Sequence, residues 1–265
     1  MVYEPIPSGP LSTIPPLEWV REKETAKLKE FFGHDIPVPQ PPPEITPELY
    51  KQWEQLGLEL HYLPAEELTE ERNLPGWTKK LGARYSSSPD IGIEFFDEVK
   101  RGVLPPDTLK LPGAWALVDG REKPQYVDGK QVYEKDFLAP ILKDLRAQRL
   151  IADHTVKESR FNIAWSELNQ KEVRDAFARV LGVPGSSVRL PRAIEWNYLG
   201  NAFHPEWGAT DTWEWLEDVY QQGGRRLGGG GFGYGGLSSI FCGDPDLPHA
   251  RLGFRLIVVF PNKTQ

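Results

Sequence analysis

Cys242 is the only cysteine of the chain, and His249 follows it seven residues later. A histidine in contact with a cysteine can take the thiol proton, and the thiolate is the nucleophile of many enzymes. Pro245 and Pro248 lie between the two residues and do not favour such a contact. We therefore interpret Cys242 as a passive thiol in a loop. A single cysteine also excludes an intrachain disulfide, a cysteine zinc cluster and a CxxC redox motif.

Two nearby motifs match known sites only in part. Residues 231–236, GFGYGG, fit the GxGxxG pattern of dinucleotide sites, but no strand is predicted before them and no helix after them. His204-Pro205-Glu206 fits the HxE half of the zinc deaminase signature, while the PCxxC half is missing. The histidines lack ligand spacing and no HExxH occurs, so we expect no metal ligands and assign each a surface or capping role. They are His34, His61, His154, His204 and His249.

Asp244 and Asp246 are the remaining candidates for a cation site. In the run CGDPDLP, their carboxylates and the nearby backbone carbonyls fit calcium. An Asx turn fixed by Pro245 explains the same residues. We therefore predict no cofactor and keep calcium as the alternative.

Most of these candidates lie in a segment rich in glycine. Nine of the fourteen residues 223–236 are glycine, and the segment leads to the strand-like run LGFRLIVVF at 252–260. About fifty residues with little regular pattern separate this run from the preceding predicted helix, and such long stretches inside a domain usually have a function. We expect an irregular loop region, turned tightly by its glycines and fixed at its far end by the last strand.

Hydrophobic periodicity predicts the elements that would position this region. Helices are predicted over residues 17–33, 46–58, 136–151, 169–182 and 191–203, and strands over 113–120 and 252–260. Thr46 is expected to cap the second helix. Asn169 and Glu172 are expected to form a capping box for the fourth helix, which Gly182 should end. Together these elements predict an α+β fold.

The first 78 residues differ in composition from the rest. Eleven prolines lie within residues 1–50, and such segments favour extended conformations that do not form a packed core alone. We interpret residues 1–78 as a proline-rich helical arm and residues 79–265 as the main domain. The arm is either a packing extension of that domain or a segment for oligomerisation or docking, and a peptide ligand for an SH3-like partner is the least favoured interpretation.

The bulk composition limits the classes of function. The 265 residues carry a net charge of −7 and contain 39% hydrophobic and 26% charged residues. This composition indicates a soluble globular protein without the basic face that nucleic-acid binding needs. No apolar stretch approaches the ~18 residues of a membrane span, and no secretory signal is visible. We expect cytoplasmic synthesis, with any action outside the cell by another route, such as release in a virus particle.

Four motifs occur here in the order found in one family. They are Arg189-Leu190-Pro191 with Glu195-Trp196, Trp213-Glu214-Trp215, the glycines from Gly223, and Gly253-Phe254-Arg255-Leu256. Over residues 110–260 the chain therefore resembles the C-type lectin-like domain in its formylglycine-generating-enzyme (sulfatase-modifying factor) form. Arg189 and Glu195 can pair with each other, and Arg255 with a buried carboxylate. The resemblance implies scaffold roles for Arg189, Pro191, Glu195, Trp196, Trp213, Trp215, Gly236, Gly253, Phe254 and Arg255.

The enzyme form of this family uses a pair of cysteines, whereas this chain has only Cys242. The chain is more similar to the non-enzymatic branch, the variable proteins of diversity-generating retroelements, many of which are encoded by phages or archaeal viruses. This resemblance implies a binding protein in which errors of reverse transcription at adenines diversify the C-terminal end of the fold. We expect the variable region over residues 205–255, where the candidate ligand-binding residues are Leu216, Phe232, Tyr234, Ser238, Ser239, Phe241, Cys242, Asp244, Asp246, Leu247, His249 and Arg251.

The expected ligand is a protein or a glycan on the surface of a host or prey cell, and not a nucleic acid or the membrane interior. The arm over residues 1–78 would multimerise the protein or attach it to a particle, which multiplies weak contacts. Two alternatives remain. One is an oxidase that resembles formylglycine-generating enzyme, and the other is a structural virion protein without a diversified site.

Overall fold

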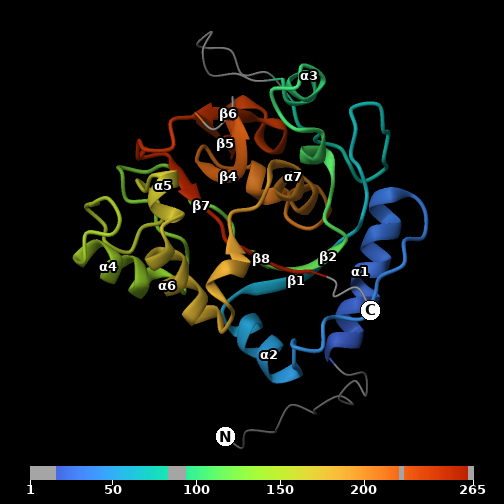
Figure 1. The fold of residues 1–265 in the computed structure, drawn as a ribbon, viewed down its shortest axis with the longest axis horizontal. Helices are drawn as coiled ribbons and strands as arrows, with labels where there is room; N and C mark the ends of the chain where they lie inside the picture. The colour runs from blue at the N-terminus through green and yellow to red at the C-terminus, as the bar shows by residue number, and fades with distance from the viewer. Residues whose placement is uncertain (1–15, 83–93, 221–223, 262–265) are drawn as a thin grey trace, which may run out of the picture.

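The computed structural model describes residues 16–82, 94–220 and 224–261, which form two four-stranded sheets with helices around them (Figure 1). The first sheet has the strand order β1-β2-β8-β3, and the second has the order β6-β5-β4-β7. The predicted α+β class is confirmed.

The first sheet joins distant parts of the chain. β1 (Leu58–Leu63) pairs with β2 (Ala114–Asp119), β2 with β8 (Ile257–Phe260), and β8 with β3 (Val188–Arg189), all antiparallel. The run AWALVD makes β2 buried along its whole length, as expected for a central strand that is covered on both faces. Trp115 of β2 lies opposite Phe260 of β8. The strand predicted over residues 113–120 is confirmed.

The second sheet arises from the region for which little regular structure was expected. β4 (Trp213–Tyr220) and β6 (Ile240–Gly243) pair antiparallel with β5 (Arg225–Gly230), while β7 (Leu252–Phe254) runs parallel to β4. The expectation of an irregular loop is therefore wrong for these strands. The run RRLGGG of β5 has no alternation of apolar and polar side chains, so periodicity does not indicate a strand there.

The single strand predicted over residues 252–260 divides between the two sheets. β7 belongs to the second sheet, β8 belongs to the first, and Arg255 and Leu256 connect them. Arg255 is fully buried and reaches Glu214 of β4. The chain therefore passes from one sheet to the other at Arg255, whose buried charge pairs with Glu214. The continuous apolar run over residues 252–260 gives no sign of this crossing.

Most helices of the described residues lie around the sheets, whereas α7 is buried and lies between them (Figure 1). The α-helices are α1 (Pro16–Phe32), α2 (Pro47–Gln55), α3 (Phe95–Lys100), α4 (Ala139–Ala147), α5 (Trp165–Leu168), α6 (Lys171–Leu181) and α7 (Ala193–Ala202). The 3₁₀ helices are η1 (Pro106–Leu109), η2 (Gly185–Ser187), η3 (Pro205–Gly208), η4 (Phe232–Tyr234) and η5 (Gly236–Ser238). The five predicted helices are present, while the short α3 and α5 were not predicted. None of the described helices is long and apolar enough to cross a membrane.

Two predicted helix ends are confirmed. The Thr46 side chain accepts a hydrogen bond from the backbone N–H of Leu49 at 3.2 Å and caps α2. Gly182 follows α6 with φ of 66°, the left-handed conformation that favours glycine.

Two predicted helix starts are corrected. Gln170, not Asn169, precedes α6, and Asn169 instead follows α5, where its side-chain amide donates to the Trp165 carbonyl at 2.9 Å. The sequence gives no sign of the short α5, and this helix moves the start of α6 by one residue. The helix predicted from Pro191 begins two residues later, at Ala193.

Residues 16–78 share the core of the rest of the chain. Phe31 of α1 packs edge-on against Tyr198 of α7 with 4.9 Å between ring centroids. The indole of Trp53 in α2 donates to the Leu181 carbonyl at 2.8 Å. The boundary predicted at residue 78 does not coincide with a break in this core, and the contacts match a packing extension. Residues 1–15 lie outside the described residues, and docking through the arm stays a prediction.

Candidate functional site

The predicted scaffold residues form a buried network under the second sheet. The Arg189 guanidinium pairs with both carboxylate oxygens of Glu195, with Nη1 and Nη2 each 2.7 Å from an oxygen. Glu195 also accepts the backbone N–H of Arg192 at 2.9 Å and so caps α7. Burial opposes ionisation of Glu195, but the Arg189 charge holds its pKa below the usual range. The expected pairing of Arg189 with Glu195 is confirmed.

Glu214 of β4 is the centre of this network. Its carboxylate accepts from Trp196 Nε1 at 3.0 Å and from the Tyr133 hydroxyl at 2.8 Å, and Arg255 Nη2 lies 3.0 Å from it. All four side chains are buried. The expected partner of Arg255 is therefore Glu214, and the network fixes β4 relative to α7 and to the link between β7 and β8.

The glycines of β5 allow close packing of neighbouring side chains. A Cβ atom at Gly229 would lie 3.1 Å from Cζ3 of Trp196 and 3.3 Å from Cδ1 of Leu216. The indole of Trp196 thus packs directly on the strand backbone. Glycine here serves close approach within a sheet, whereas the sequence suggested that it serves the turns of a loop.

A cavity of about 630 Å³ opens beside the second sheet. Its aromatic part is built around Trp213, whose ring stacks on Tyr234 with centroids 5.5 Å apart and meets Phe241 edge-on at 4.8 Å. Trp215 lies 6.2 Å from Phe241. The lining consists of Trp213, Trp215, Tyr234, Phe241, Cys242, Gly243, Asp244, Leu247, Pro248, His249, Arg251 and Leu252.

The other side of the cavity is the segment between β6 and β7. Asp244 Oδ1 accepts the backbone N–H of Asp246 at 2.9 Å, which is the predicted Asx turn. His249 Nδ1 accepts the backbone N–H of Arg251 at 3.1 Å. Burial and the nearby Arg251 lower the pKa of His249, so this ring is neutral at pH 7. The rim therefore offers carboxylate, imidazole and guanidinium groups beside an apolar floor.

Arg251 connects the rim to a distant segment. Its guanidinium lies over the Tyr126 ring, 4.5 Å from the centroid, and 3.8 Å from Asp211 Oδ2. Tyr126 was not predicted because it lies far from the glycine-rich segment in the sequence and belongs to no recognisable motif. Asp211 lies within the predicted variable region over residues 205–255, but it was not among the candidate ligand-binding residues. The contact holds one side of the rim at a fixed position.

Seven of the twelve candidate ligand-binding residues line this cavity. They are Tyr234, Phe241, Cys242, Asp244, Leu247, His249 and Arg251. Phe232 and Asp246 are exposed and Ser238 is partly exposed, but they are not among the lining residues. Leu216 and Ser239 are fully buried in the core and cannot contact a ligand on the surface.

The predicted scaffold residues also fall into two groups, those that line the cavity and those that do not. Trp213 and Trp215 form the floor of the cavity, so they belong to the site as well as to the scaffold. The others are buried or half-buried away from its lining: Arg189, Pro191, Glu195, Trp196, Gly236, Gly253, Phe254 and Arg255.

The histidines are not all isolated surface residues as expected. His61 and His204 are buried, and together with Glu59 they present ligand atoms that all lie within 4.8 Å of one another. The two histidines are far apart in the sequence, so ligand spacing could not reveal the group. Glu206 of the HxE motif accepts from His204 Nδ1 at 3.0 Å.

Comparisons with protein-family models, curated proteins and solved structures gave no match for this chain.

Proposed function

We propose that the protein binds ligands through the aromatic cavity of the second sheet, on a C-type lectin-like scaffold of the formylglycine-generating-enzyme type. In this proposal it is a variable protein of a diversity-generating retroelement, and the side chains around the cavity are its diversified positions. The supporting observation is that seven residues selected from the sequence as ligand contacts line one cavity. Tyr234 comes from η4, Phe241 and Cys242 come from β6, and the other four come from the segment between β6 and β7.

The cavity suits recognition because it combines fixed aromatic rings with a polar rim. Trp213, Tyr234 and Phe241 offer rigid apolar surface, which is typical of the residues that dominate binding energy. Arg251 and Asp244 add charges at the edge. A volume of about 630 Å³ accommodates a protein side chain or a sugar ring, which agrees with the ligand that the resemblance implies, a protein or a glycan on a cell surface.

Diversification needs positions that change without unfolding the protein. Leu247 is 62% exposed and Phe232 is 69% exposed. The neighbouring strands β4 and β5 are fixed through Glu214 and the close contact at Gly229. Substitutions at the rim therefore change the surface and leave the backbone in place.

Sequencing of codons 205–255 across the source population tests the diversification. We expect substitutions to concentrate at Phe232, Asp244, Leu247 and His249, with adenine-rich codons in a linked template copy. Val127 is 61% exposed outside this region and is the matched control for exposure. An invariant segment would contradict the proposal and favour the structural virion protein.

Binding is tested with a printed oligosaccharide array and an array of cell-surface proteins. For a ligand that the wild-type chain captures, Leu247→Ser and Arg251→Ala should lower the signal at least tenfold, while Val127→Ser leaves it unchanged. Capture that is insensitive to both rim variants would place the binding surface elsewhere.

One observation favours the oxidase alternative. Cys242 lines the cavity, and Arg225 Nη1 lies 3.6 Å from its sulfur. The Cys242→Ser variant distinguishes the two functions. An oxidase would lose oxygen consumption on a cysteine-containing peptide, whereas a binding protein keeps its melting temperature and its capture of the array ligand.

A further inference from the structure

A second group of chemically active side chains shares no residue with the aromatic cavity. Glu59 and His61 lie on β1, and His204 lies between α7 and η3. Glu59 Oε2 is 3.3 Å from His61 Nε2 and 3.7 Å from His204 Nε2. A tetrahedral zinc ion with bonds of about 2.1 Å holds its ligand atoms about 3.4 Å apart. These two separations are close to that spacing, and all three ligand atoms lie within 4.8 Å of one another.

Hydrogen bonds fix which nitrogen of each ring faces this centre. His61 Nδ1 lies 3.0 Å from Glu24 Oε1, and His204 Nδ1 lies 3.0 Å from Glu206 Oε1. A carboxylate only accepts, so each Nδ1 carries the hydrogen, and in the neutral ring Nε2 has a lone pair for a metal. Histidines that bind metals usually donate their other N–H to a carboxylate in this way.

The two inward-facing nitrogens have no hydrogen-bond partner within the described residues. His61 is 1% exposed and His204 is 6% exposed, and Nε2 of each ring is buried. A buried nitrogen without a partner is costly, because it has lost its hydrogen bond to water. A cation bound between these two atoms and the Glu59 carboxylate would give both nitrogens a partner.

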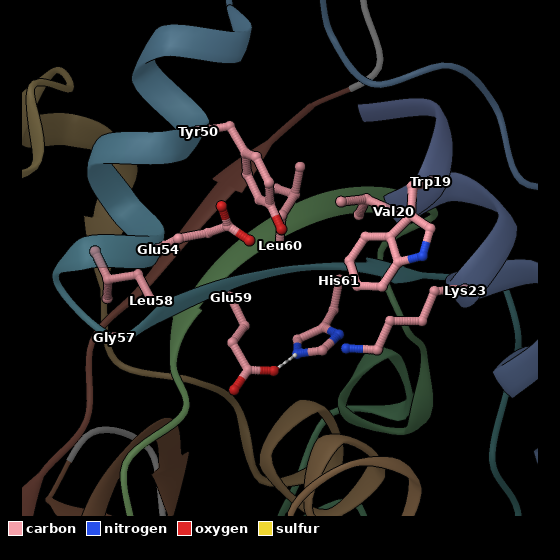
Figure 2. Close-up of a pocket in the computed structure, with 10 residues that line it drawn as sticks. All are labelled: Trp19, Val20, Lys23, Tyr50, Glu54, Gly57, Leu58, Glu59, Leu60 and His61. Atoms are coloured by element: carbon pink, nitrogen blue, oxygen red, sulfur yellow. Dashed lines mark ion pairs between the residues drawn. The ribbon is translucent and has the colours of Figure 1, made fainter. Parts of the chain in front are cut away.

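Packing holds the rings in place. The Phe203 ring lies against His61 at 4.0 Å between centroids, and the Trp207 ring stacks on His204 at 4.5 Å with 5° between planes. The backbone of Gly120 approaches closely, since a Cβ there would overlap the Glu59 carboxylate and lie 3.2 Å from Cε1 of His204. Figure 2 shows Glu59 and His61, both on β1, turned toward one another among the residues that line a pocket.

We propose that Glu59, His61 and His204 bind a divalent transition-metal ion of the zinc type, with Glu24 and Glu206 orienting the two imidazoles. Imidazole ligands favour such ions over calcium and magnesium. Three protein ligands leave a fourth position for water or another small ligand. A pocket of about 290 Å³ lined by Glu59 and His61 adjoins the group. The ion would join β1 to the turn after α7, independently of the function proposed for the aromatic cavity.

A metal-free arrangement accounts for only part of these contacts. Glu24 and Glu59 both lie within ion-pair distance of His61, at 3.0 Å from Nδ1 and 3.3 Å from Nε2, so a protonated His61 would pair with both carboxylates. His204 Nε2 would still face Glu59 at 3.7 Å without a hydrogen bond. A bound metal gives all three groups a partner.

The test uses the full chain, treated with a chelator and then titrated with Zn²⁺ or Co²⁺. We expect one equivalent of Zn²⁺ by elemental analysis, a higher melting temperature with Zn²⁺, and visible absorption bands with Co²⁺. Glu59→Gln should weaken Zn²⁺ binding at least tenfold, and Glu206→Gln should weaken it by roughly 10- to 100-fold. His154→Ala and His249→Ala are controls, because these histidines lie outside the group.

Two results would overturn the proposal. The first is a folded wild-type chain that takes up no Zn²⁺, which would support the metal-free ion group. The second is uptake that Glu59→Gln and His204→Gln do not change, which would indicate adventitious binding only. The Glu59 side chain is 40% exposed, so its amide variant should fold, and circular dichroism checks this.

Discussion

The two sheets differ in the exposure of the side chains on them and next to them. In the first sheet, Asp119 at the end of β2 is fully buried and lies 2.6 Å from Nη2 of Arg160, which also pairs with Asp136. Next to the second sheet, Leu247 and His249 stand at the open rim of a cavity. A change in the first sheet breaks several buried contacts at once, whereas a change at the rim of the second alters only the surface.

Glu214 shows where this difference begins within the second sheet. Its carboxylate is buried among Trp196, Tyr133 and Arg255, although the neighbouring Trp213 and Trp215 line the cavity. Alternation along β4 thus separates the buried network from the lining of the cavity within three residues. The difference is therefore one between the buried interior and the side of the second sheet that faces the cavity. The following substitutions test it.

The largest effect is expected for Arg255→Leu. It leaves the Glu214 carboxylate buried without its cation, which typically lowers the free energy of unfolding by about 3–5 kcal/mol. Urea unfolding followed by tryptophan fluorescence measures the loss. Lys171→Ala breaks a pair with Asp175 whose lysine side chain is 83% exposed, and it should cause no measurable change. Equal effects of the two variants would contradict the buried network.

A pH-dependent effect is expected at Asp218 of β4, which accepts the backbone N–H of Ala193 at 2.5 Å. Burial raises the pKa of Asp218 from 3.8 to about 6. Between these values the folded state keeps a proton that the unfolded state has lost, so its contribution to stability falls as the pH rises. The complete fall is on the order of 3 kcal/mol, of which about 2 kcal/mol occurs between pH 4 and pH 6.

Urea unfolding of the wild type and of Asp218→Asn across pH 4–7 measures this fall. The stability of the wild type relative to the variant should decrease as the pH rises. Asp144→Asn, at an exposed position of α4, is the control and should show no such trend. A parallel pH profile for wild type and Asp218→Asn would show that the carboxyl is not desolvated.

A smaller loss is expected for Gly229→Ala. The added methyl group would lie 3.1 Å from the Trp196 ring, and overpacking of a core costs about 1–3 kcal/mol. Gly233→Ala is the matched control, because no atom lies within 4 Å of a Cβ there. Thermal unfolding compares the two variants. If both melt like the wild type, close packing does not explain the glycine of β5.

The smallest effect is expected for Leu247→Ser at the rim. This side chain is 62% exposed, so the free energy of unfolding should change by less than about 0.5 kcal/mol. Leu216→Ser makes the same exchange at a fully buried position of β4 and should destabilise the protein strongly. Similar melting temperatures for the two variants would remove the distinction between rim and interior.

The sequence predicted the local elements better than the sheets. Helices with clear periodicity and the buried strand β2 were found, because their signals lie in consecutive residues. β5 was missed, since three of its six residues are glycines, two of which pack against rings from α7 and β6. The division at Arg255 was missed because its cause is a contact with Glu214, which no local pattern records.

The aromatic cavity and the group of Glu59, His61 and His204 also differ in how far the sequence predicts them. Much of the aromatic cavity was predictable, because Phe241 to Arg251 form one continuous segment next to a recognisable glycine run. The group of Glu59, His61 and His204 was not, because the pairing of β1 with β2 and the packing of α7 bring its parts together. Sequence spacing detects ligands on one element and fails for ligands that tertiary structure assembles.

The position of β8 has a consequence for synthesis of the protein. This strand lies between β2 and β3, yet it follows the whole proposed variable segment in the chain. A nascent polypeptide cannot close its first sheet until the ribosome has translated that segment in frame and released the residues after it. A stop codon or frameshift anywhere before codon 257 therefore removes a central strand of the first sheet, and the product is left for proteases. Under the proposed diversification, only variants that keep the reading frame through β8 reach the folded state.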